Sequence, residues 1–544
     1  MTDWKFADIY EAIAAAIPDA PCQVSGDRVT TWGEFDRRAN AFAADLIDAG
    51  LTHQSKMAAY LYNGVEYLET YIGAFKGGFA PVNTNYRYGP EEIVYLFDNA
   101  DAEAVVFHAS FTPLLEGIRS RLSKVRRWYV VSDDAGDGPD WAVSYESVVA
   151  KGADRTIAPW GRSGKDLLLL YTGGTTGMPK GVMWEQDELF NVLGAGGQPL
   201  LGLAPISSAE DAGERLRASV SAGAPLPVTM SACPLMHGTG QFSSLITMNL
   251  GGSVVTLPDR KFDAGELWRT CQDRHVNSLI IVGDAFARPM VQALDANPGK
   301  WDLSSLALIS SSGVMWSHEV KERLLEHIPN VMLFDSFGSS EAVGMGASLS
   351  TKGAASETAA FMLGERVAVF TEDGRRVEPG SDESGMVAVS GFLPAGYYKD
   401  QAKTDATFKV FEGKRWSVPG DWAQVNPDGT LHLLGRGSVC INTGGEKVFP
   451  EEVEEVLKLH PAVRDAVCVG IPDERFGETI CAVVEASATA SDVDADDVIA
   501  HVKGSLAAYK APRNVVVVDT IGRSPAGKVD YKGLKALAAE RLGK

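Results

Sequence analysis

Short apolar runs alternate with amphipathic stretches through most of this 544-residue chain. The runs are four or five residues long and many are bounded by Gly, Pro or Ser, which is typical of buried strands. The stretches between them have helical spacing; one begins with a capping box at 31–34 and continues over 35–47. This alternation predicts an α/β fold with mainly parallel sheets. The expected strands are 57–61, 104–107, 128–131, 167–171, 228–232, 254–257, 279–282, 306–309 and 331–334.

The composition changes after about residue 360. Short strands separated by turns of Gly, Pro and Asp predict a smaller β-rich portion over about 360–435. A last unit begins near Gly435 and reads as an α+β domain of roughly a hundred residues. Its expected elements are helices over 451–459 and 493–506, and strands over 467–471, 480–485 and 515–518. We therefore predict a large N-terminal domain over 1–435 and a small one over 439–544.

Composition also restricts the class of protein. Apolar residues make up 45% of the chain and charged residues 22%, as in a globular protein. The net charge of −21 opposes binding to nucleic acid and to anionic membranes. No apolar run reaches the ~18–20 residues of a membrane helix, and residues 1–10 show no signal pattern, so a cytoplasmic protein is expected. The six cysteines predict neither disulfides nor a zinc site. The oligomeric state stays open, a homodimer included.

The most informative segment follows the expected strand at 167–171. It reads Tyr171-Thr172-Gly173-Gly174-Thr175-Thr176-Gly177-Met178-Pro179-Lys180-Gly181. Glycines let backbone N–H groups turn toward an anion, threonine hydroxyls add donors, and Lys180 adds a positive charge. A flexible surface turn is the alternative, but this combination in one loop favours phosphate binding. The loop is neither a Walker A motif, because Pro179 and Gly181 flank the lysine, nor a dinucleotide-binding loop.

Five further motifs follow in order along the chain. They are Phe337-Gly338-Ser339-Ser340-Glu341, Pro419-Gly420-Asp421, Gly435-Arg436, Thr443-Gly444-Gly445-Glu446-Lys447 and Ser524-Pro525-Ala526-Gly527-Lys528. With the phosphate loop, they closely resemble the adenylate-forming superfamily: acyl-CoA synthetases, firefly-type luciferases and the adenylation domains of peptide synthetases. The resemblance covers essentially the whole chain. It is greatest to acyl-CoA synthetases of the fatty-acid or steroid side-chain type.

This resemblance implies a ligase that uses ATP, Mg²⁺ and coenzyme A. A carboxylate attacks the α-phosphate of ATP to give an acyl-adenylate, and CoA then takes the acyl group with AMP as the leaving group. The alternatives are a luciferase-like monooxygenase, an enzyme that loads a carrier protein, and a non-catalytic acyl-binding relative. The last is disfavoured because Lys180, Glu341, Asp421 and Lys528 are all present. Apolar residues over 235–250 favour a medium or long apolar acyl group, whether a fatty acid, a steroid side-chain acid or an arylalkanoate.

The resemblance also implies the phosphate and metal contacts. Thr175, Thr176 and Lys180 would bind the β- and γ-phosphates, within a loop that includes Thr172, Gly173, Gly174 and Gly177. Glu341 and Thr176 would hold Mg²⁺, and carboxylate and hydroxyl oxygens are the ligands that this ion prefers. A solvated surface acid is the alternative for Glu341.

Adenine and ribose contacts are implied in the same way. The adenine side would be formed by Ser312, Gly313, Ser336, Phe337, Gly338 and Ser340. Phe337, where the family usually has Tyr, would stack on the purine; plain core packing is nearly as good an explanation. Asp421 would accept both ribose hydroxyls and Arg436 would also reach the ribose. Without the resemblance, Asp421 would be an ordinary turn aspartate.

The remaining roles concern acyl and CoA transfer. Lys528 would bridge the carboxylate and the α-phosphate, and His237 would gate the acyl site. The loop with Gly444, Gly445 and Glu446 would contact the pantetheine arm, and Phe476, Tyr509 and Lys510 the CoA nucleotide. Residues 436–438 would form the hinge about which the small domain turns. The family usually has Asp or Lys at the position of Ser438, so a role for a charged hinge side chain is not expected here.

Overall fold

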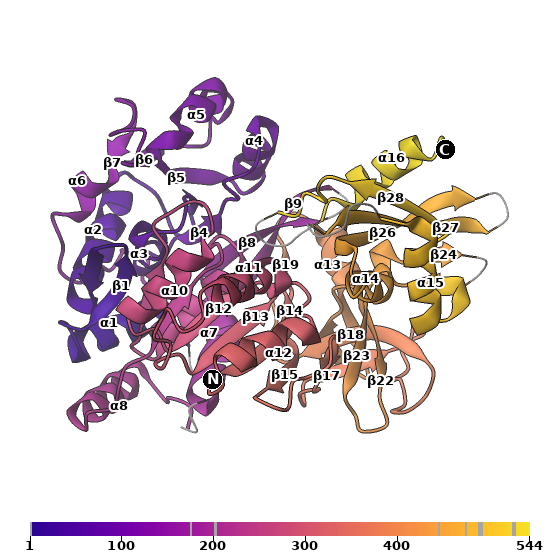
Figure 1. Ribbon diagram of the computed structural model, residues 1–544. Helices are drawn as coiled ribbons and strands as arrows, with labels where there is room; N and C mark the ends of the chain where they lie inside the picture. Colours follow the sequence, from indigo (N-terminus) through magenta and orange to yellow (C-terminus); the bar gives the residue numbers. More distant parts are fainter. Residues whose placement is uncertain are drawn as a thin grey trace.

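A computed structural model describes residues 3–174, 177–200, 204–443, 446–473, 476–487, 493–524 and 529–544. Within these ranges the chain forms four β-sheets and the helices that pack on them (Figure 1). Two large, mainly parallel sheets belong to the N-terminal part. An antiparallel sheet follows, and a small α+β unit ends the chain. The predicted α/β class, with a large N-terminal domain and a smaller C-terminal domain, is therefore confirmed.

The first sheet combines the start of the chain with its middle. Its order is β15-β14-β13-β12-β10-β11-β1-β2, parallel except for the antiparallel pairs at its two edges. The strands are β1 (Pro21–Ser25), β2 (Arg28–Thr31), β10 (Val228–Ser231), β11 (Ser253–Thr256), β12 (Ser278–Ile281), β13 (Leu308–Ser312), β14 (Met332–Ser339) and β15 (Ala342–Ser350). Gln23 of β1 lies opposite Val254 of β11, so segments more than 200 residues apart are neighbours.

The second sheet has the order β19-β9-β8-β4-β3-β5-β6-β7. Its strands are β3 (Lys56–Tyr60), β4 (Ala80–Asn83), β5 (Ala102–His108), β6 (Arg127–Val131), β7 (Val143–Ser144), β8 (Leu167–Gly174), β9 (Gly177–Glu185) and β19 (Gly396–Tyr397). β8 and β9 form an antiparallel hairpin, and β19 adds to β9 at the edge. A segment near residue 396 is thereby placed beside the glycine-rich loop.

Two smaller sheets complete the structure. In the antiparallel sheet the order is β16-β23-β22-β18-β21-β20, with β17 beside β18; in the last sheet it is β25-β24-β27-β26, with β28 beside β27. The first of them contains β16 (Ala360–Phe361), β17 (Val367–Phe370), β18 (Ser384–Ser390), β20 (Phe408–Phe411), β21 (Lys414–Ser417), β22 (Asp421–Val425) and β23 (Leu431–Arg436). The second contains β24 (Ile441–Thr443), β25 (Glu446–Val448), β26 (Val463–Asp473), β27 (Gly477–Ala486) and β28 (Asn514–Val518). A short 3₁₀ turn, Gly437–Val439, connects the two sheets.

Helices cover the sheets. In the N-terminal part they are α1 (Phe6–Ala16), α2 (Trp32–Asp48), α3 (Val65–Lys76), α4 (Pro90–Asn99), α5 (Thr112–Ile118), α6 (Tyr145–Val149), α7 (Gln186–Leu200), α8 (Ala209–Ser221), α9 (Gly238–Asn249), α10 (Ala264–Asp273), α11 (Gly283–Ala296), α12 (His318–His327) and α13 (Gln401–Thr407). In the last unit they are α14 (Pro450–Lys458), α15 (Ala495–Ser505) and α16 (Tyr531–Arg541). The predicted cap of α2 is confirmed, because the Thr31 hydroxyl accepts a hydrogen bond from the Glu34 N–H at 3.2 Å.

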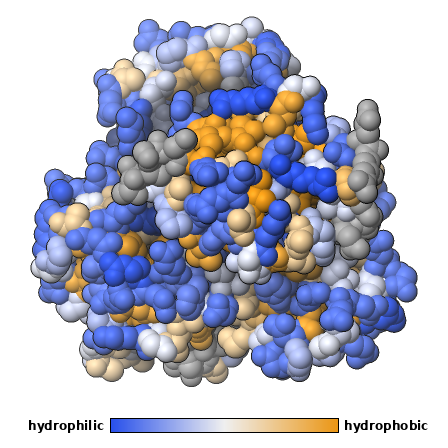
Figure 2. Space-filling view, turned by 45° about the vertical axis from the view of Figure 1, so that its right-hand side comes forward, coloured by the Kyte–Doolittle hydropathy of each residue, from blue (hydrophilic) through white to orange (hydrophobic). Residues whose placement is uncertain are grey.

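The visible surface is mostly hydrophilic (Figure 2). Hydrophobic side chains on this face gather in one area in its upper middle, surrounded by hydrophilic ones. In the part of the chain that the structure describes, no helix has both the length and the apolar character needed to cross a membrane.

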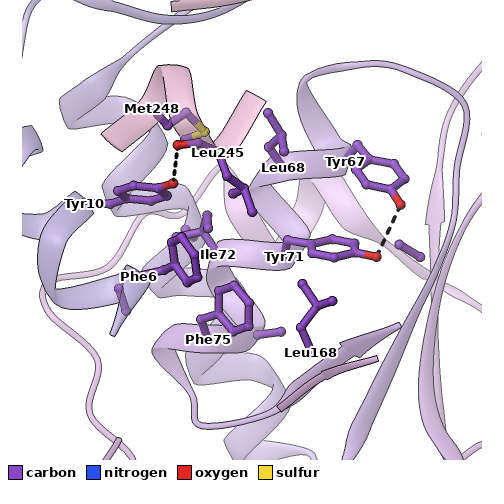
Figure 3. Close-up of a cluster of buried hydrophobic side chains, with 14 of the residues drawn as sticks. Phe6, Tyr10, Tyr67, Leu68, Tyr71, Ile72, Phe75, Leu168, Leu245 and Met248 are labelled. Carbon is purple, nitrogen blue, oxygen red and sulfur yellow. Dashed lines mark hydrogen bonds between the residues drawn. The ribbon is translucent and has the colours of Figure 1, made fainter. Parts of the chain in front are cut away.

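The largest core joins elements that are far apart in the sequence (Figure 3). Phe6 of α1 stacks on Phe75 of α3, with their ring centroids 5.5 Å apart. The Tyr10 hydroxyl donates a hydrogen bond to the Leu245 carbonyl of α9 at 3.2 Å, so its polar end is satisfied inside the core. The core therefore ties the first helix of the chain to α3 and α9.

Candidate active site

The glycine-rich loop lies at the turn of the β8–β9 hairpin. β8 continues to Gly174, beyond the predicted strand at 167–171, and β9, which begins at Gly177, was not predicted. Thr172 lies opposite Lys180. Ladder hydrogen bonds between antiparallel strands extend the strands into glycine-rich sequence, where local preference alone does not predict a strand. Thr175 and Thr176 lie outside the described residues. Gly173, Gly174 and Gly177 are described only as strand positions.

Lys180 already has a negatively charged partner. Its ammonium forms an ion pair with the carboxylate of Asp400. Asp400 also caps α13, where it accepts a hydrogen bond from the Lys403 N–H at 2.9 Å. Mainly because of Lys180, the pKa of Asp400 lies below its usual range. An ammonium has three N–H donors, so a phosphate oxygen would share Lys180 with the Asp400 carboxylate or replace it.

Glu341 lies in the tight turn between β14 and β15. The sequence predicted a strand only over 331–334. Residues 337–339 also belong to strand β14, because β14 pairs with β15 as far as Ser339. The Tyr397 hydroxyl donates a hydrogen bond to Oε1 of Glu341 at 2.6 Å. The indole N–H of Trp184 holds the same turn through the Ser340 carbonyl at 3.0 Å. The second oxygen of Glu341, Oε2, has no hydrogen bond within the described part of the chain, so this carboxylate fits a hard cation such as Mg²⁺.

Asp421 and Arg436 lie opposite each other on β22 and β23. Arg436 Nε donates to Asp421 Oδ1 at 3.3 Å, whereas Oδ2 is buried and has no partner among the described residues. Burial raises the pKa of Asp421, the Arg436 guanidinium lowers it, and the nearby charge of Glu341 raises it further. The Glu341 carboxylate thus acts electrostatically on the Asp421–Arg436 pair. The buried, unpaired Oδ2 is an acceptor that suits a ribose hydroxyl.

The residues expected at the adenine lie on neighbouring strands. Ser312 ends β13 directly opposite Ser336 of β14, and the exposed Gly313 follows. Phe337 is half-buried, and its ring packs against Phe361 with the centroids 5.5 Å apart. Part of the Phe337 ring thus belongs to a core contact and part remains accessible. Stacking on a purine stays a prediction.

His237 immediately precedes α9. A Cβ at Gly238 would make ordinary contacts with Leu170 and Phe242, and a Cβ at Gly313 would lie 3.4 Å from the Thr239 hydroxyl. The start of α9 therefore lies beside the segment predicted for adenine. The ring of Phe242 meets Trp184 edge-to-face at 6.3 Å, so apolar side chains adjoin the Glu341 turn.

The predicted CoA residues lie in the C-terminal unit. Gly444, Gly445 and Lys528 are outside the described residues, and Glu446 is described only as the first position of β25. The Arg513 guanidinium lies 3.9 Å from the centroid of the Phe476 ring, while Tyr509 is 47% exposed. Lys510 forms an ion pair with Glu452 at 2.5 Å.

A buried carboxylate joins the C-terminal unit to β23. Glu451 of α14 accepts a hydrogen bond from the Arg436 N–H at 3.5 Å, and its Oε2 is buried without a partner in the described part of the chain. Gly435 has φ +119°, and a side chain there would overlap the Glu451 carboxylate. Burial, followed by the charge of Glu454, raises the pKa of Glu451 to about 8.

Three supporting residues were missed by the sequence reasoning. Tyr397 contacts Glu341 and Asp400 contacts Lys180, as described above. The buried Asn83 amide donates to the Tyr171 carbonyl at 2.8 Å and to the Met236 carbonyl at 2.7 Å. Asn83 thereby fixes the start of the glycine-rich loop beside the segment that carries His237. An aspartate before a helical pattern could have drawn attention to Asp400; Tyr397 and Asn83 carry no comparable signal.

Comparison with known proteins identifies the family. The family model of the AMP-binding enzymes matches residues 10–398, and that of the AMP-binding enzyme C-terminal domain matches residues 452–528. The chain belongs to the AMP-binding enzyme family, which confirms the resemblance seen in the sequence. The expected class, an AMP-forming acid–CoA ligase that uses ATP, Mg²⁺ and CoA, is confirmed with it.

Full-length relatives agree with this class. A medium/long-chain-fatty-acid–CoA/3-oxocholest-4-en-26-oate–CoA ligase of Mycolicibacterium smegmatis is 40% identical, over 99% of this chain and 97% of its own. A 3-oxocholest-4-en-26-oate–CoA ligase of Rhodococcus rhodochrous is also 40% identical, over 98% and 95%. The crystal structure of an anthranilate CoA ligase with anthranoyl-AMP has the same fold, with a TM-score of 0.83 at 21% identity over 100% of this chain and 98% of its own.

Proposed function

We propose that this ligase activates an acid with a large apolar acyl group, either a medium- or long-chain fatty acid or a steroid side-chain acid. The observation that carries this proposal is the 40% identity over nearly the full length to relatives named for these acids. The apolar side chains of Trp184 and Phe242 beside the Glu341 turn support it. An anthranilate ligase shares the fold at 21% identity, but that likeness concerns the fold alone.

We infer the following division of labour. Lys180 and Glu341 hold the phosphate side of the nucleotide, and Asp421 with Arg436 holds the ribose. Bound Mg²⁺ supplies neutralisation of phosphate charge. The acid carboxylate attacks the α-phosphate, the bond to pyrophosphate breaks, and Lys528 stabilises the charge where the two groups meet. The CoA thiol then forms the thioester, loses its proton, and AMP leaves.

The second step needs a different arrangement of the small domain. We propose that residues 436–438 are its hinge, and that a turn there withdraws Lys528 and brings Gly444 and Gly445 to the acyl-adenylate. Gly437 and Ser438 suit this role because small residues absorb a backbone rotation. On this proposal residues 1–435 and 439–544 are the two rigid parts. The Glu451 contact with the end of β23 would belong to one of the two domain orientations.

An acid panel tests the substrate proposal. The enzyme, ATP and Mg²⁺ are incubated with fatty acids of increasing chain length, with 3-oxocholest-4-en-26-oate, and with benzoate as a small aromatic control, each with and without CoA. We expect AMP and acyl-CoA from the large apolar acids and little from benzoate. Preference for benzoate would refute the proposed substrate class. Light emission or CoA-independent loading of a carrier protein would instead favour one of the alternative functions.

We propose that the protein acts in the cytoplasm on its three substrates and that it forms a homodimer. Cell fractionation tests the location, and light scattering coupled to size-exclusion chromatography tests the oligomeric state.

A further inference from the structure

The Gly396–Tyr397 strand and the turn after it contact both phosphate-side motifs. β19 pairs with β9, the strand that carries Lys180, and the Tyr398 N–H donates to the Gly181 carbonyl at 2.8 Å. Three residues after Tyr397, Asp400 forms the ion pair with Lys180. This short segment therefore lies between the glycine-rich hairpin and the Glu341 turn, and its own position is fixed by backbone hydrogen bonds.

Tyr397 itself is held on several sides. Its side chain is buried, its ring packs against Phe408 with the centroids 6.2 Å apart, and its N–H donates to the Thr404 hydroxyl at 2.9 Å. The hydroxyl can therefore hardly move away from Glu341 Oε1, 2.6 Å distant. A phenol is protonated at neutral pH, so the Tyr397 hydroxyl donates this hydrogen bond to the carboxylate.

Glu341 has no comparable support of its own. It lies in a two-residue turn and is half-exposed, and among the described residues Tyr397 is its one hydrogen-bonding side chain. A glutamate in such a turn samples several rotamers unless a neighbour selects one. The hydrogen bond from Tyr397 uses Oε1 and leaves Oε2 directed elsewhere.

We propose that Tyr397 is a positioning residue for metal binding: by holding Oε1 of Glu341, it presents Oε2 to the Mg²⁺ that accompanies ATP. This inference rests on the proposed function, in which Glu341 is the carboxylate ligand of that ion. Tyr397 touches neither ATP nor the metal. Its contribution is to select the rotamer of the Glu341 side chain that binds the ion before the ion is bound.

The adjacent tyrosine provides a matched control. The Tyr398 hydroxyl also donates to a carboxylate, that of Asp101 at 2.8 Å, on the same segment but away from Glu341. Tyr397→Phe and Tyr398→Phe thus each remove one hydroxyl that is bonded to an acid, and each keeps the ring. A purely structural effect of losing such a bond would appear in both variants.

The experiment measures binding without turnover. Affinity for ATP is determined by calorimetry in the absence of acid and CoA, once with Mg²⁺ and once with EDTA, and the ratio gives the enhancement by Mg²⁺. We expect Tyr397→Phe to reduce this ratio about tenfold, the lower end for a lost hydrogen bond to a charged group. Affinity in EDTA and the thermal midpoint should stay near those of the parent. Tyr398→Phe should leave the ratio unchanged.

A double-mutant cycle with Glu341→Gln completes the test. If Tyr397 acts through Glu341, adding Tyr397→Phe to Glu341→Gln should reduce the ratio no further, whatever its effect on stability. An unchanged ratio in Tyr397→Phe, or equal and independent losses in the cycle, would overturn the inference alone. If the parent enzyme bound ATP equally well with and without Mg²⁺, the proposed role of Glu341 would fail as well.

Discussion

Replacing Asp421 by Asn should weaken nucleotide binding through the ribose. Asp421 is 5% exposed, one of its oxygens accepts from Arg436 at 3.3 Å, and the other is buried without a partner in the described structure. An asparagine oxygen can satisfy Arg436, but its NH₂ group would then face the ribose hydroxyls as a second donor. The lost interaction is a hydrogen bond to a charged group, worth about 1.5–3 kcal/mol. We therefore expect ATP to bind about 10- to 150-fold more weakly.

The assay compares two nucleotides on three proteins. Calorimetry gives the affinities of ATP and 2′,3′-dideoxy-ATP for the parent, Asp421→Asn and Asp428→Asn. Asp428 is an exposed aspartate in the turn at the other end of the β22–β23 hairpin, where it accepts from the Thr430 N–H. It therefore controls for loss of an aspartate away from the site. The parent should prefer ATP strongly, and Asp428→Asn should behave like the parent. In Asp421→Asn the preference for ATP should largely disappear.

The comparison separates a ribose contact from a structural effect. Misfolding would weaken both nucleotides equally and would lower the thermal midpoint. If Asp421→Asn kept the full preference for ATP over the dideoxy nucleotide, Asp421 would not contact the ribose. Its buried oxygen would then need another explanation.

Three further predictions concern charge and domain movement. Lys180→Ala should weaken ATP binding about 10- to 100-fold in calorimetry without lowering the thermal midpoint, because Lys180 is half-exposed and is not part of a core. Lys528→Ala should slow adenylate formation by roughly two to three orders of magnitude but still convert supplied acyl-AMP and CoA, and Gly445→Leu should do the reverse; equal loss of both half-reactions would refute the two-orientation mechanism. Burial raises the pKa of Glu451 to about 8, whereas in the unfolded chain the carboxyl loses its proton near pH 4.5. The folded state therefore binds more protons between these values, so stability toward urea should fall as the pH rises from about 4.5 to 8. In Glu451→Gln that fall should be smaller, and an identical pH profile would contradict the buried position of the carboxylate.

The family resemblance assigned Asp421 and Arg436, from two neighbouring motifs, to one part of the site. The structure places them opposite each other on β22 and β23, and their contact with a ribose stays a prediction. The alternation of strands and helices likewise predicted the two mainly parallel sheets. Both inferences depend on residues close together in the sequence, or on a periodicity that is local.

The support of the site could not be predicted in this way. Tyr397 is 56 residues from Glu341, and Asp400 is 220 residues from Lys180. Each pair meets only because β19 adds to β9 at the sheet edge, and neither partner shows that pairing in its own neighbourhood. The extension of β14 to Ser339 has a similar cause, since its partner β15 supplies the hydrogen bonds after the apolar run has ended.

The position of β1 affects how the protein is made. A ribosome adds about 5–20 residues per second, so β1 emerges about ten seconds or more before β11, its parallel neighbour, exists. Until then, β1 has only β2 beside it, and an isolated two-stranded hairpin is marginally stable in water. β1 must therefore wait, with one edge unpaired, for a segment near residue 256. A nascent chain that stalls before that point would display an unpaired strand edge to chaperones, proteases and its own copies.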